Sequence, residues 1–581
     1  MKKNTFKKIA LLLGCFFAFL SASAQTNTST KAGDWNDTSV WSLGLVPTSA
    51  HDVVIGTHIV TIRSGVTAFA NSLTTKASPS QLIIRENASL TVTGNIVQGR
   101  ANDAIYLFGL NVSNSALNYK MGTIIFGGTI DTKKSRIRQA LPPNKWHLVS
   151  NPFANAIIAN TTHPSSAIFN NLVVNGSSKK SLAYYDDSLA DGSKYVYYNN
   201  SPTPTGNFPI AKGLSVMVND VIATGGTTHD FTFAGIMHNG SVSTTISDAG
   251  NGFNLVGNPY ISYLNANTGA HATNNLLAVN VGVLEEQTIW LWDSANSAFV
   301  TKNLSDPAFR INPIQGFFVK AKSGGGAAQT MNFNKTMESH SETNAYFKTS
   351  NNRFEINLAL TVSDVTRKTA IRYIENQTTD FDNGYDSSIF GGYDSGATIF
   401  TELAENNTGK KLAIQSLPNT NYENMIIPIG VNAAAGKEIT FSAEAMNLPN
   451  DIKVFIEDRL SNTMTRLDEA NASYKVTTAD ALNGTGRFYL HTKSSSVLST
   501  DELALQSVSI YKTSDETLRV VGLTQGTANI KLFNILGKQM MGKKFQSNGS
   551  SDIGLPKLAK GVYIVQLETA TGNLNKKIIL E

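Results

Sequence analysis

The sequence predicts an all-β protein built from several domains. Apolar runs after residue 24 are short and alternate with polar residues, Gly, Asn, Asp and Ser bound them, and none keeps a helical repeat for long. The 581 residues suffice for three to five domains at about 150 residues each. With 41% hydrophobic and 16% charged residues, the chain is expected to be globular rather than disordered.

The first 24 residues have the features of a secretory signal peptide. A lysine-rich start precedes an apolar run from Ile9 to Leu20, and Ala22-Ser23-Ala24 stands before Gln25, which predicts cleavage between Ala24 and Gln25. A lipoprotein signal ending at Cys15 is the alternative, although the apolar run continues past that cysteine. No later stretch reaches 18 apolar residues, so we expect a soluble mature chain outside the cytoplasm.

Charge and cysteine content exclude several classes of function. Without the leader and its four lysines, the chain has 44 basic and 43 acidic residues, which excludes a nucleic-acid binder that works through bulk charge. Cys15 is the single cysteine and lies in the leader. The mature chain therefore has no disulfide, thiolate metal site or cysteine nucleophile.

Residues 25–140 are predicted to form a short β-solenoid-like region. Strand-sized pieces such as HIVTI and QLIIRENASLTV follow one another with small Asn and Gly turns between them, although a small β-sandwich would also fit. Trp35 and Trp41 precede these pieces. We favour a role for the two tryptophans in capping an open solenoid end over a role in ligand binding.

The middle of the chain repeats itself. WHLVSNPFA, which starts at Trp146, matches FNLVGNPYIS, which starts at Phe253, and Gly213 aligns with Gly316 further along. The matches predict a tandem duplication into β-domains at 141–245 and 246–343.

Two further segments follow the repeats. Residues 344–493 contain at least seven strand-like runs, which predicts a jelly-roll or immunoglobulin-like β-sandwich. The serine-rich segment 494–507 is typical of a linker.

The last block, residues 508–581, combines alternating strands with glycine turns and predicts a small immunoglobulin-like β-sandwich. Its motifs resemble the type A C-terminal sorting domain of the Bacteroidota type IX secretion system. The residues that carry the resemblance most clearly are Leu536, Gly537, Gly561, Val562, Tyr563, Lys576 and Lys577. The family often opens with Tyr-Pro-Asn-Pro, where this chain has Tyr511-Lys512-Thr513-Ser514.

The resemblance implies a route and a set of partners. Such domains carry their cargo through the type IX translocon and are then cleaved by its sortase, often with attachment to surface lipopolysaccharide. The implied location is the medium or the outer cell surface. Residues 25–507 also resemble adhesin-like flavobacterial cargo, through motifs such as LVGNPY, but this second resemblance names no activity.

Two places carry candidate site residues, and each has an ordinary structural alternative. Asp380, Asp382 and Asp386 lie close together beside Gly384, so they either bind Ca²⁺ or form a plain acidic turn. Trp290 and Trp292 share one face of a predicted strand, so they either stack on sugar rings or belong to the core. No other cofactor is expected.

No sequence motif for catalysis is present among GxGxxG, the Walker loop, HExxH and GxSxG. The first hypothesis is therefore a non-catalytic, adhesin-like binding protein that presents tandem β-domains, with an extracellular glycan as a candidate partner. The alternative is a polysaccharide-degrading hydrolase or lyase, because carboxylate pairs leave no sequence signature. Two carboxyl groups about 5–9.5 Å apart in a deep cleft would favour the hydrolase.

Overall fold

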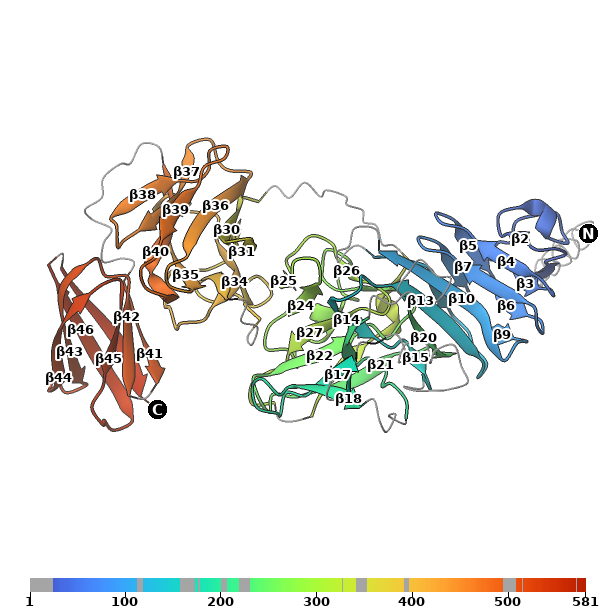
Figure 1. Ribbon diagram of the computed structural model, residues 1–581, viewed down its shortest axis with the longest axis horizontal. Helices are drawn as coiled ribbons and strands as arrows, with labels where there is room; N and C mark the ends of the chain where they lie inside the picture. Colours follow the sequence, from blue (N-terminus) through green and yellow to red (C-terminus); the bar gives the residue numbers. More distant parts are fainter. Residues whose placement is uncertain are drawn as a thin grey trace, which may run out of the picture.

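Strand-built regions follow one another along the longest axis of the computed structural model, from the N-terminal coil to the C-terminal sandwich (Figure 1). The structure describes residues 24–111, 119–156, 172, 174–175, 178–199, 206–218, 230–325, 328–340, 353–390, 396–494, 508–514, 516–570 and 572–580. Apart from Ala24, the predicted signal peptide lies outside the described residues, as do residues 495–507 of the predicted linker. The fold is all-β, as the sequence predicts. No helix among the described residues is both long and apolar enough to cross a membrane.

In the N-terminal region the strands of successive turns of the chain pair in parallel. Its strands lie on three faces: β1 (Gln25–Thr28), β3 (His51–Ile55), β6 (Ser72–Thr75) and β9 (Ile96–Gln98); β2 (Gly33–Asp34), β4 (Ile59–Ile62), β7 (Gln81–Ile84), β10 (Asn102–Asn111) and β13 (Lys134–Ala140); and β5 (Thr67–Ala70), β8 (Ser89–Val92) and β12 (Thr123–Phe126). The short β11 (Tyr119–Met121) runs antiparallel to β10. Alternate residues point inward, so Val60 and Leu82 are fully buried in neighbouring rungs.

Trp35 and Trp41 are buried beside the first strands of this coil. Their rings meet edge to face with centroids 5.1 Å apart, and Trp41 Nε1 donates a hydrogen bond of 2.7 Å to the Trp35 carbonyl. Both rings are thus part of the core at the coil end, which agrees with the capping role and leaves neither face for a ligand.

The two central repeats share one strand order. Copy 1 has the order β14 (Trp146–Ser150), β19 (Gly213–Met217), β17 (Lys179–Tyr185), β18 (Tyr195–Asn199), and copy 2 has β22 (Phe253–Gly257), β27 (Gly316–Lys320), β24 (Thr288–Asp293), β25 (Ala298–Asn303). Each copy also includes an antiparallel pair: β13 with β20 (Asp230–Met237), and β21 (Val242–Ile246) with β28 (Gln329–Phe333).

The strands paired in this way run from residue 134 to residue 237 in copy 1 and from residue 242 to residue 333 in copy 2. β13 belongs to two structures at once: it pairs with β20 of copy 1, and it also continues the sheet of the N-terminal region by pairing with β10. Short elements complete the repeats: β15 (Phe153–Ala154), β16 (Val174–Asn175), β23 (Tyr263–Asn265), α3 (Leu276–Val279), β26 (Arg310–Ile311), η3 (Lys335–Met337) and β29 (Glu338–Ser339).

The copies contact each other through equivalent residues, as in a two-fold dimer. Val149 of copy 1 bridges Gln315 of copy 2, and the equivalent Val256 of copy 2 bridges Lys212 of copy 1. Likewise Ser150 N donates to Ile314 O at 2.8 Å, and Gly257 N donates to Ala211 O at 3.0 Å. The duplication therefore builds one double unit rather than two separate modules.

Glycine at the aligned positions makes this contact possible. A Cβ at Gly316 would lie 2.8 Å from Val149 O, which is a backbone atom that cannot rotate away. We therefore expect Gly316→Ala to lower the free energy of unfolding by about 1–3 kcal/mol, measured in urea. Gly282→Ala is the matched control in the same copy, because nothing lies within 4 Å of its added Cβ. Equal losses in both variants would contradict close packing between the copies.

The asparagine of each Asn-Pro motif is fully buried and organises the turn after β14 or β22. Asn258 Nδ2 donates to the carbonyl oxygens of Ser262, Asn312 and Ile311 at 2.8, 3.0 and 3.3 Å, and its Oδ1 accepts from Tyr260 N at 3.0 Å. The equivalent Asn151 donates to two carbonyls and accepts from the amide two residues on. Each amide thus satisfies backbone groups that would otherwise be buried without partners.

A single sheet of eleven strands forms the next region: β30 (Glu355–Val362), β31 (Val365–Ile374), β32 (Ser387–Ser388), β33 (Ala397–Thr401), β34 (Leu412–Pro418), β35 (Ile426–Ala433), β36 (Glu438–Met446), β37 (Ile452–Asp458), β38 (Thr463–Arg466), β39 (Tyr474–Thr477) and β40 (Leu482–Ser494). The sheet rolls onto itself, because Phe441 of β36 and Phe488 of β40 meet at 4.8 Å although five strands separate β36 from β40 in the sheet order. One core results, as in a sandwich, but the hydrogen bonding is continuous and the pair β31–β34 is parallel.

The C-terminal region is a seven-stranded, two-sheet antiparallel sandwich, as the sequence predicts. The sheets are β41 (Ser509–Ser514), β42 (Thr517–Val521) and β45 (Ser550–Gly554), and β44 (Gln539–Ser547), β43 (Gly526–Asn534), β46 (Gly561–Thr569) and β47 (Gly572–Leu580). Both sheets bury one face in a shared apolar core that includes Leu518, Ile530 and Val565.

Candidate functional site

The three aspartates predicted to bind calcium lie in a loop between β31 and β32, and hydrogen bonds occupy their oxygens. Asp386 accepts from Asp382 N at 2.7 Å and from Ser416 N at 2.5 Å. Asp382 accepts from Thr378 N at 2.6 Å, and Asp380 from the side chain of Asn406. Among the described residues, no group of three or more His, Cys, Asp or Glu side chains is placed to hold a metal ion. Each of the three carboxylates thus accepts a hydrogen bond from the protein, as it would in an acidic turn.

Burial raises the pKa of Asp386 from 3.8 to about 7, and the hydrogen bonds from Asp382 and Ser416 oppose that rise. Because the folded state holds this proton more tightly, the stabilisation is complete below pH 3.8 and is lost as the pH rises through about 7. We expect a loss of about 4 kcal/mol across this range. Urea unfolding at pH 5 and pH 8 should show about 3 kcal/mol of that loss, because part of it has already occurred between pH 3.8 and pH 5. Asp386→Asn, which does not titrate there, should lack that part of the pH dependence. An identical dependence in both proteins would contradict the prediction.

The end of the same loop joins the rolled sheet to copy 2. Asn303 Nδ2 donates to Tyr385 O at 2.6 Å, and Ser388 donates from N and Oγ to the buried carboxylate of Glu286 at 2.8 and 2.6 Å. Trp290 Nε1 also donates to Ser388 O, at 2.9 Å. The acidic turn thus leads into a structural junction.

This junction buries Trp290, one of the two residues for which the sequence left a sugar platform and a core position as alternatives. The side chain of Trp290 is 0% exposed and packs edge to face against Phe253, so it belongs to the core. Trp292 is half-buried, donates its Nε1 hydrogen bond to Trp146 O and packs against Phe299. Strand alternation correctly placed the two rings on one face. Local sequence patterns could not show that the rolled sheet covers Trp290 and that Trp292 contacts copy 1.

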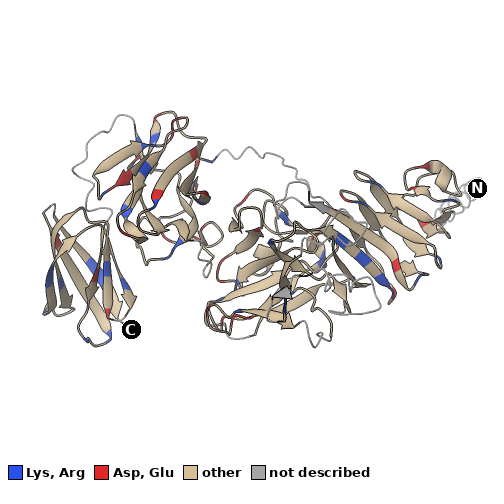
Figure 2. Ribbon diagram, in the orientation of Figure 1, with Lys and Arg blue, Asp and Glu red and all other residues tan. Residues whose placement is uncertain are grey.

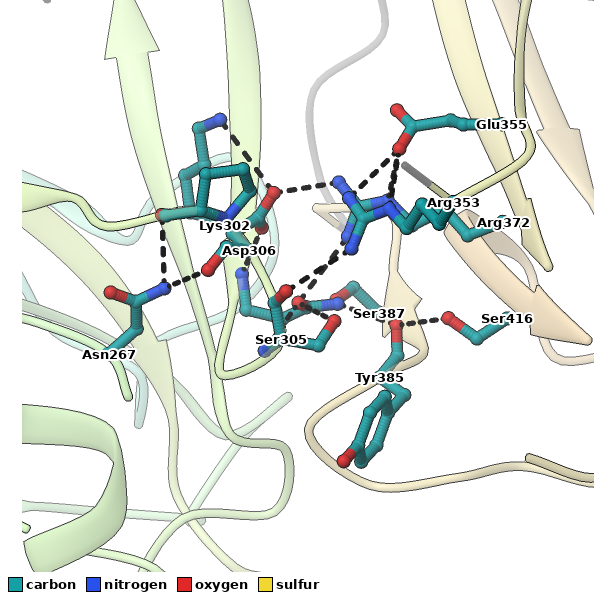
Figure 3. Close-up of polar contacts among 12 residues, drawn as sticks. Asn267, Lys302, Ser305, Asp306, Arg353, Glu355, Arg372, Tyr385, Ser387 and Ser416 are labelled. Carbon is teal, nitrogen blue, oxygen red and sulfur yellow. Dashed lines mark hydrogen bonds and ion pairs between the residues drawn. The ribbon is translucent and has the colours of Figure 1, made fainter. Parts of the chain in front are cut away.

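A cluster of buried charges, here called the charged joint, lies beside this junction and consists of Asp306, Arg353, Glu355 and Arg372 (Figure 3). Arg372 Nη2 is 2.7 Å from Asp306 Oδ1, and its Nε is 3.4 Å from Glu355 Oε2. Arg353 pairs with Glu355 at 2.8 Å and donates to Ser305 O across the junction. Burial tends to raise the pKa of Asp306, but Arg372 and then Lys302 outweigh it, so the pKa lies below its ordinary value.

A groove of about 840 Å³ lies between copy 2 and one end of the rolled sheet, where β31, β33, β34 and β40 begin and β35 ends. On one side it is lined by Phe299 and Thr301 of β25, and on the other by residues of β31, β33, β34, β35 and β40. Phe299 and Phe390 stack at its wall with ring centroids 4.0 Å apart, and both are only half-buried.

Three cationic residues line the groove: Arg367, Lys368 and Lys411. Arg367 donates to the carbonyls of Asn296 and Ser297 in copy 2. Neither Lys368 nor Lys411 forms an ion pair with a described residue, and the described residues that line the groove include no Asp or Glu. The groove therefore offers positive charge beside an aromatic wall.

The sequence analysis missed these lysines. They lie 43 positions apart and belong to no motif. The parallel register of β31 and β34, in which Ala370 pairs with Ile414, brings them to the same end of the two strands.

The residues of the sorting motif gather in one sheet of the C-terminal sandwich. Leu536 is 87% exposed at the turn between β43 and β44, where Gly537 has a φ of +77°. Gly561, Val562 and Tyr563 open β46, and the Tyr563 hydroxyl donates to Ala559 O at 2.7 Å. Lys576 and Lys577 lie on the neighbouring β47 and pair with Val565 and Ile564.

Residues 514–581 match the secretion system C-terminal sorting domain. This match begins six residues after the start expected from the sequence, inside the strand pair that opens the sandwich. The protein is therefore cargo of the type IX secretion system: it interacts with that machinery, and it is exported to be secreted or attached to the cell surface.

No curated protein matches this chain. Residues 26–491 match the family described as Domain of unknown function (DUF8693). That span takes in the N-terminal coil, both repeats and nearly all of the rolled sheet. Because the match covers well over half of the chain, this protein belongs to the DUF8693 family, and it carries that domain ahead of a type IX sorting domain.

Proposed function

We propose that this protein is a non-catalytic, adhesin-like binding protein that holds an extracellular glycan in the groove between copy 2 and the rolled sheet. The lining of that groove carries the proposal: a stacked phenylalanine wall, three cations, and no carboxylate among the described lining residues. Aromatic rings and fixed charges bind a ligand, whereas glycoside hydrolysis generally requires a pair of carboxyl groups.

The two copies support this function by holding the groove in place, and not by providing two binding sites for one polymer. Lys368 and Lys411, which give the groove its charge, belong to the rolled sheet, and Arg367 of that sheet donates to carbonyls of copy 2. The polar contacts of residues 385–388 and the charged joint run from the rolled sheet to copy 2. Copy 1 in turn supports copy 2 through their two-fold contact. One groove for each chain is the expected stoichiometry.

A pull-down and an activity assay on the same material test the proposal. Residues 25–581 are incubated with immobilised polysaccharides and arrayed glycans, and the release of reducing ends and of unsaturated sugars is followed in parallel. We expect retention on at least one polymer without release of either product. Turnover of a polymer would overturn the non-catalytic assignment, and failure to bind any glycan would overturn the binding function.

A further inference from the structure

The residues that line the groove indicate the chemical class of its ligand. This further inference rests on the proposed binding function. We propose that the ligand is an acidic glycan, a polysaccharide with carboxylate or sulfate groups. Its anionic groups lie against Lys368 and Lys411, and its sugar faces lie on the half-buried edge of the Phe299–Phe390 stack.

Charge complementarity is the first argument. Lys368 of β31 and Lys411, which immediately precedes β34, line the same groove, and neither forms an ion pair with a described residue. The Lys411 ammonium lies 4.9 Å from the centroid of the Phe400 ring and interacts electrostatically with Glu402, whereas Lys368 is exposed. The adjacent Lys410 differs, because it pairs with the buried Glu286 at 3.1 Å. Lys368, Lys411 and Arg367 together place three positive charges in one groove, in a chain whose mature net charge is only +1.

The aromatic wall and the groove size are the second argument. Phe299 and Phe390 are continuous with the buried Phe318, whose centroid lies 4.6 Å from that of Phe390, so the wall is held rigidly from behind. A rigid aromatic surface binds the apolar face of a sugar ring at little entropic cost. A volume of about 840 Å³ lies within the range of ligand sites, and an elongated polymer can occupy it in part.

Export limits the anionic compounds that the groove can encounter. The sorting domain delivers this groove to the cell exterior, where charged polysaccharides are exposed and intracellular phosphate compounds are not. Amides also line the groove, from Asn432 and Asn483, and they supply donors and acceptors for sugar hydroxyls. A polyanion recognised by charge alone would not require them.

Isothermal titration of residues 25–581 tests the assignment. The probes are polygalacturonate and a sulfated galactan, compared with neutral dextran and with single-stranded DNA as a polyanion without the sugar faces of a glycan. We expect binding to at least one acidic glycan, weakening with added salt, and much weaker binding to dextran and DNA. Lys368→Glu combined with Lys411→Glu should weaken that binding roughly tenfold or more.

Lys475→Glu is the matched control, since Lys475 is an exposed lysine on β39 of the same sheet and does not line the groove. The double variant Lys368→Gln with Lys411→Gln keeps the test valid if charge reversal perturbs folding, and melting temperatures check each protein. Glycan binding that is unchanged by both double variants would overturn the groove assignment and leave the binding function intact. Preference for dextran or for DNA would overturn the acidic-glycan assignment, and binding to no glycan would overturn the proposed function itself.

Discussion

Replacing Asp306 by asparagine is expected to lower the free energy of unfolding by about 3–5 kcal/mol. The Asp306 side chain is 1% exposed and that of Arg372 is 6% exposed, so the substitution leaves a buried guanidinium without its closest counter-charge. Asparagine has the same shape, which separates the loss of charge from the loss of volume. Urea unfolding gives the total effect, and hydrogen exchange at residues 385–388 reports whether the junction opens first.

The control is an exposed pair in the same chain. Arg519 and Asp552 lie 2.7 Å apart, but their side chains are 32% and 48% exposed. Water compensates the remaining charge there, so Asp552→Asn should cost less than about 1 kcal/mol. If Asp306→Asn cost no more than this control, the charged joint would not hold copy 2 to the rolled sheet.

Replacing Asn258 by alanine is expected to cost about 3–4 kcal/mol of unfolding free energy. The change removes the side-chain donor from three carbonyl oxygens and the acceptor from the amide of Tyr260 in a fully buried site. Asn312 O keeps its hydrogen bond from Gln315 N at 3.2 Å, whereas each group that loses its partner carries a desolvation cost of about 1–3 kcal/mol, which local rearrangement partly relieves. Asn151→Ala in copy 1 should behave similarly, because its amide makes the equivalent bonds. Thermal and urea unfolding of the mature chain measure both.

Asn296→Ala is the corresponding control in copy 2. This exposed asparagine donates one side-chain hydrogen bond, to Asp293 at 2.8 Å, and water can replace it. A loss below about 1 kcal/mol is expected. Similar losses for Asn258→Ala and Asn296→Ala would show that the buried amide does not organise the turn.

Whether the sequence could predict a feature depends on how far apart in the chain the interacting residues lie. Strand alternation and the glycine turns of the last 74 residues are local patterns, and they correctly predicted an all-β chain and a terminal sandwich. Alternation also placed Trp290 and Trp292 on one face. It could not show that Ser388, 98 residues further on, covers Trp290.

The acidic loop shows the same limit at the candidate site. The spacing of Asp380, Asp382 and Asp386 suits either a cation or a turn, and the choice depends on the distant amide of Ser416 and on burial. The groove itself has no sequence signature, because Phe299, Lys368 and Lys411 lie far apart in the chain and belong to two regions.

By itself, the sequence determined the all-β class and the export route, since each depends on residues close together in the chain or on one compact motif block. The tertiary structure alone decided which aromatic rings are core, how the copies pair and where cations meet an open aromatic wall. The physical reason is that burial and charge pairing are set by strands that chain folding brings together, whatever their separation in sequence.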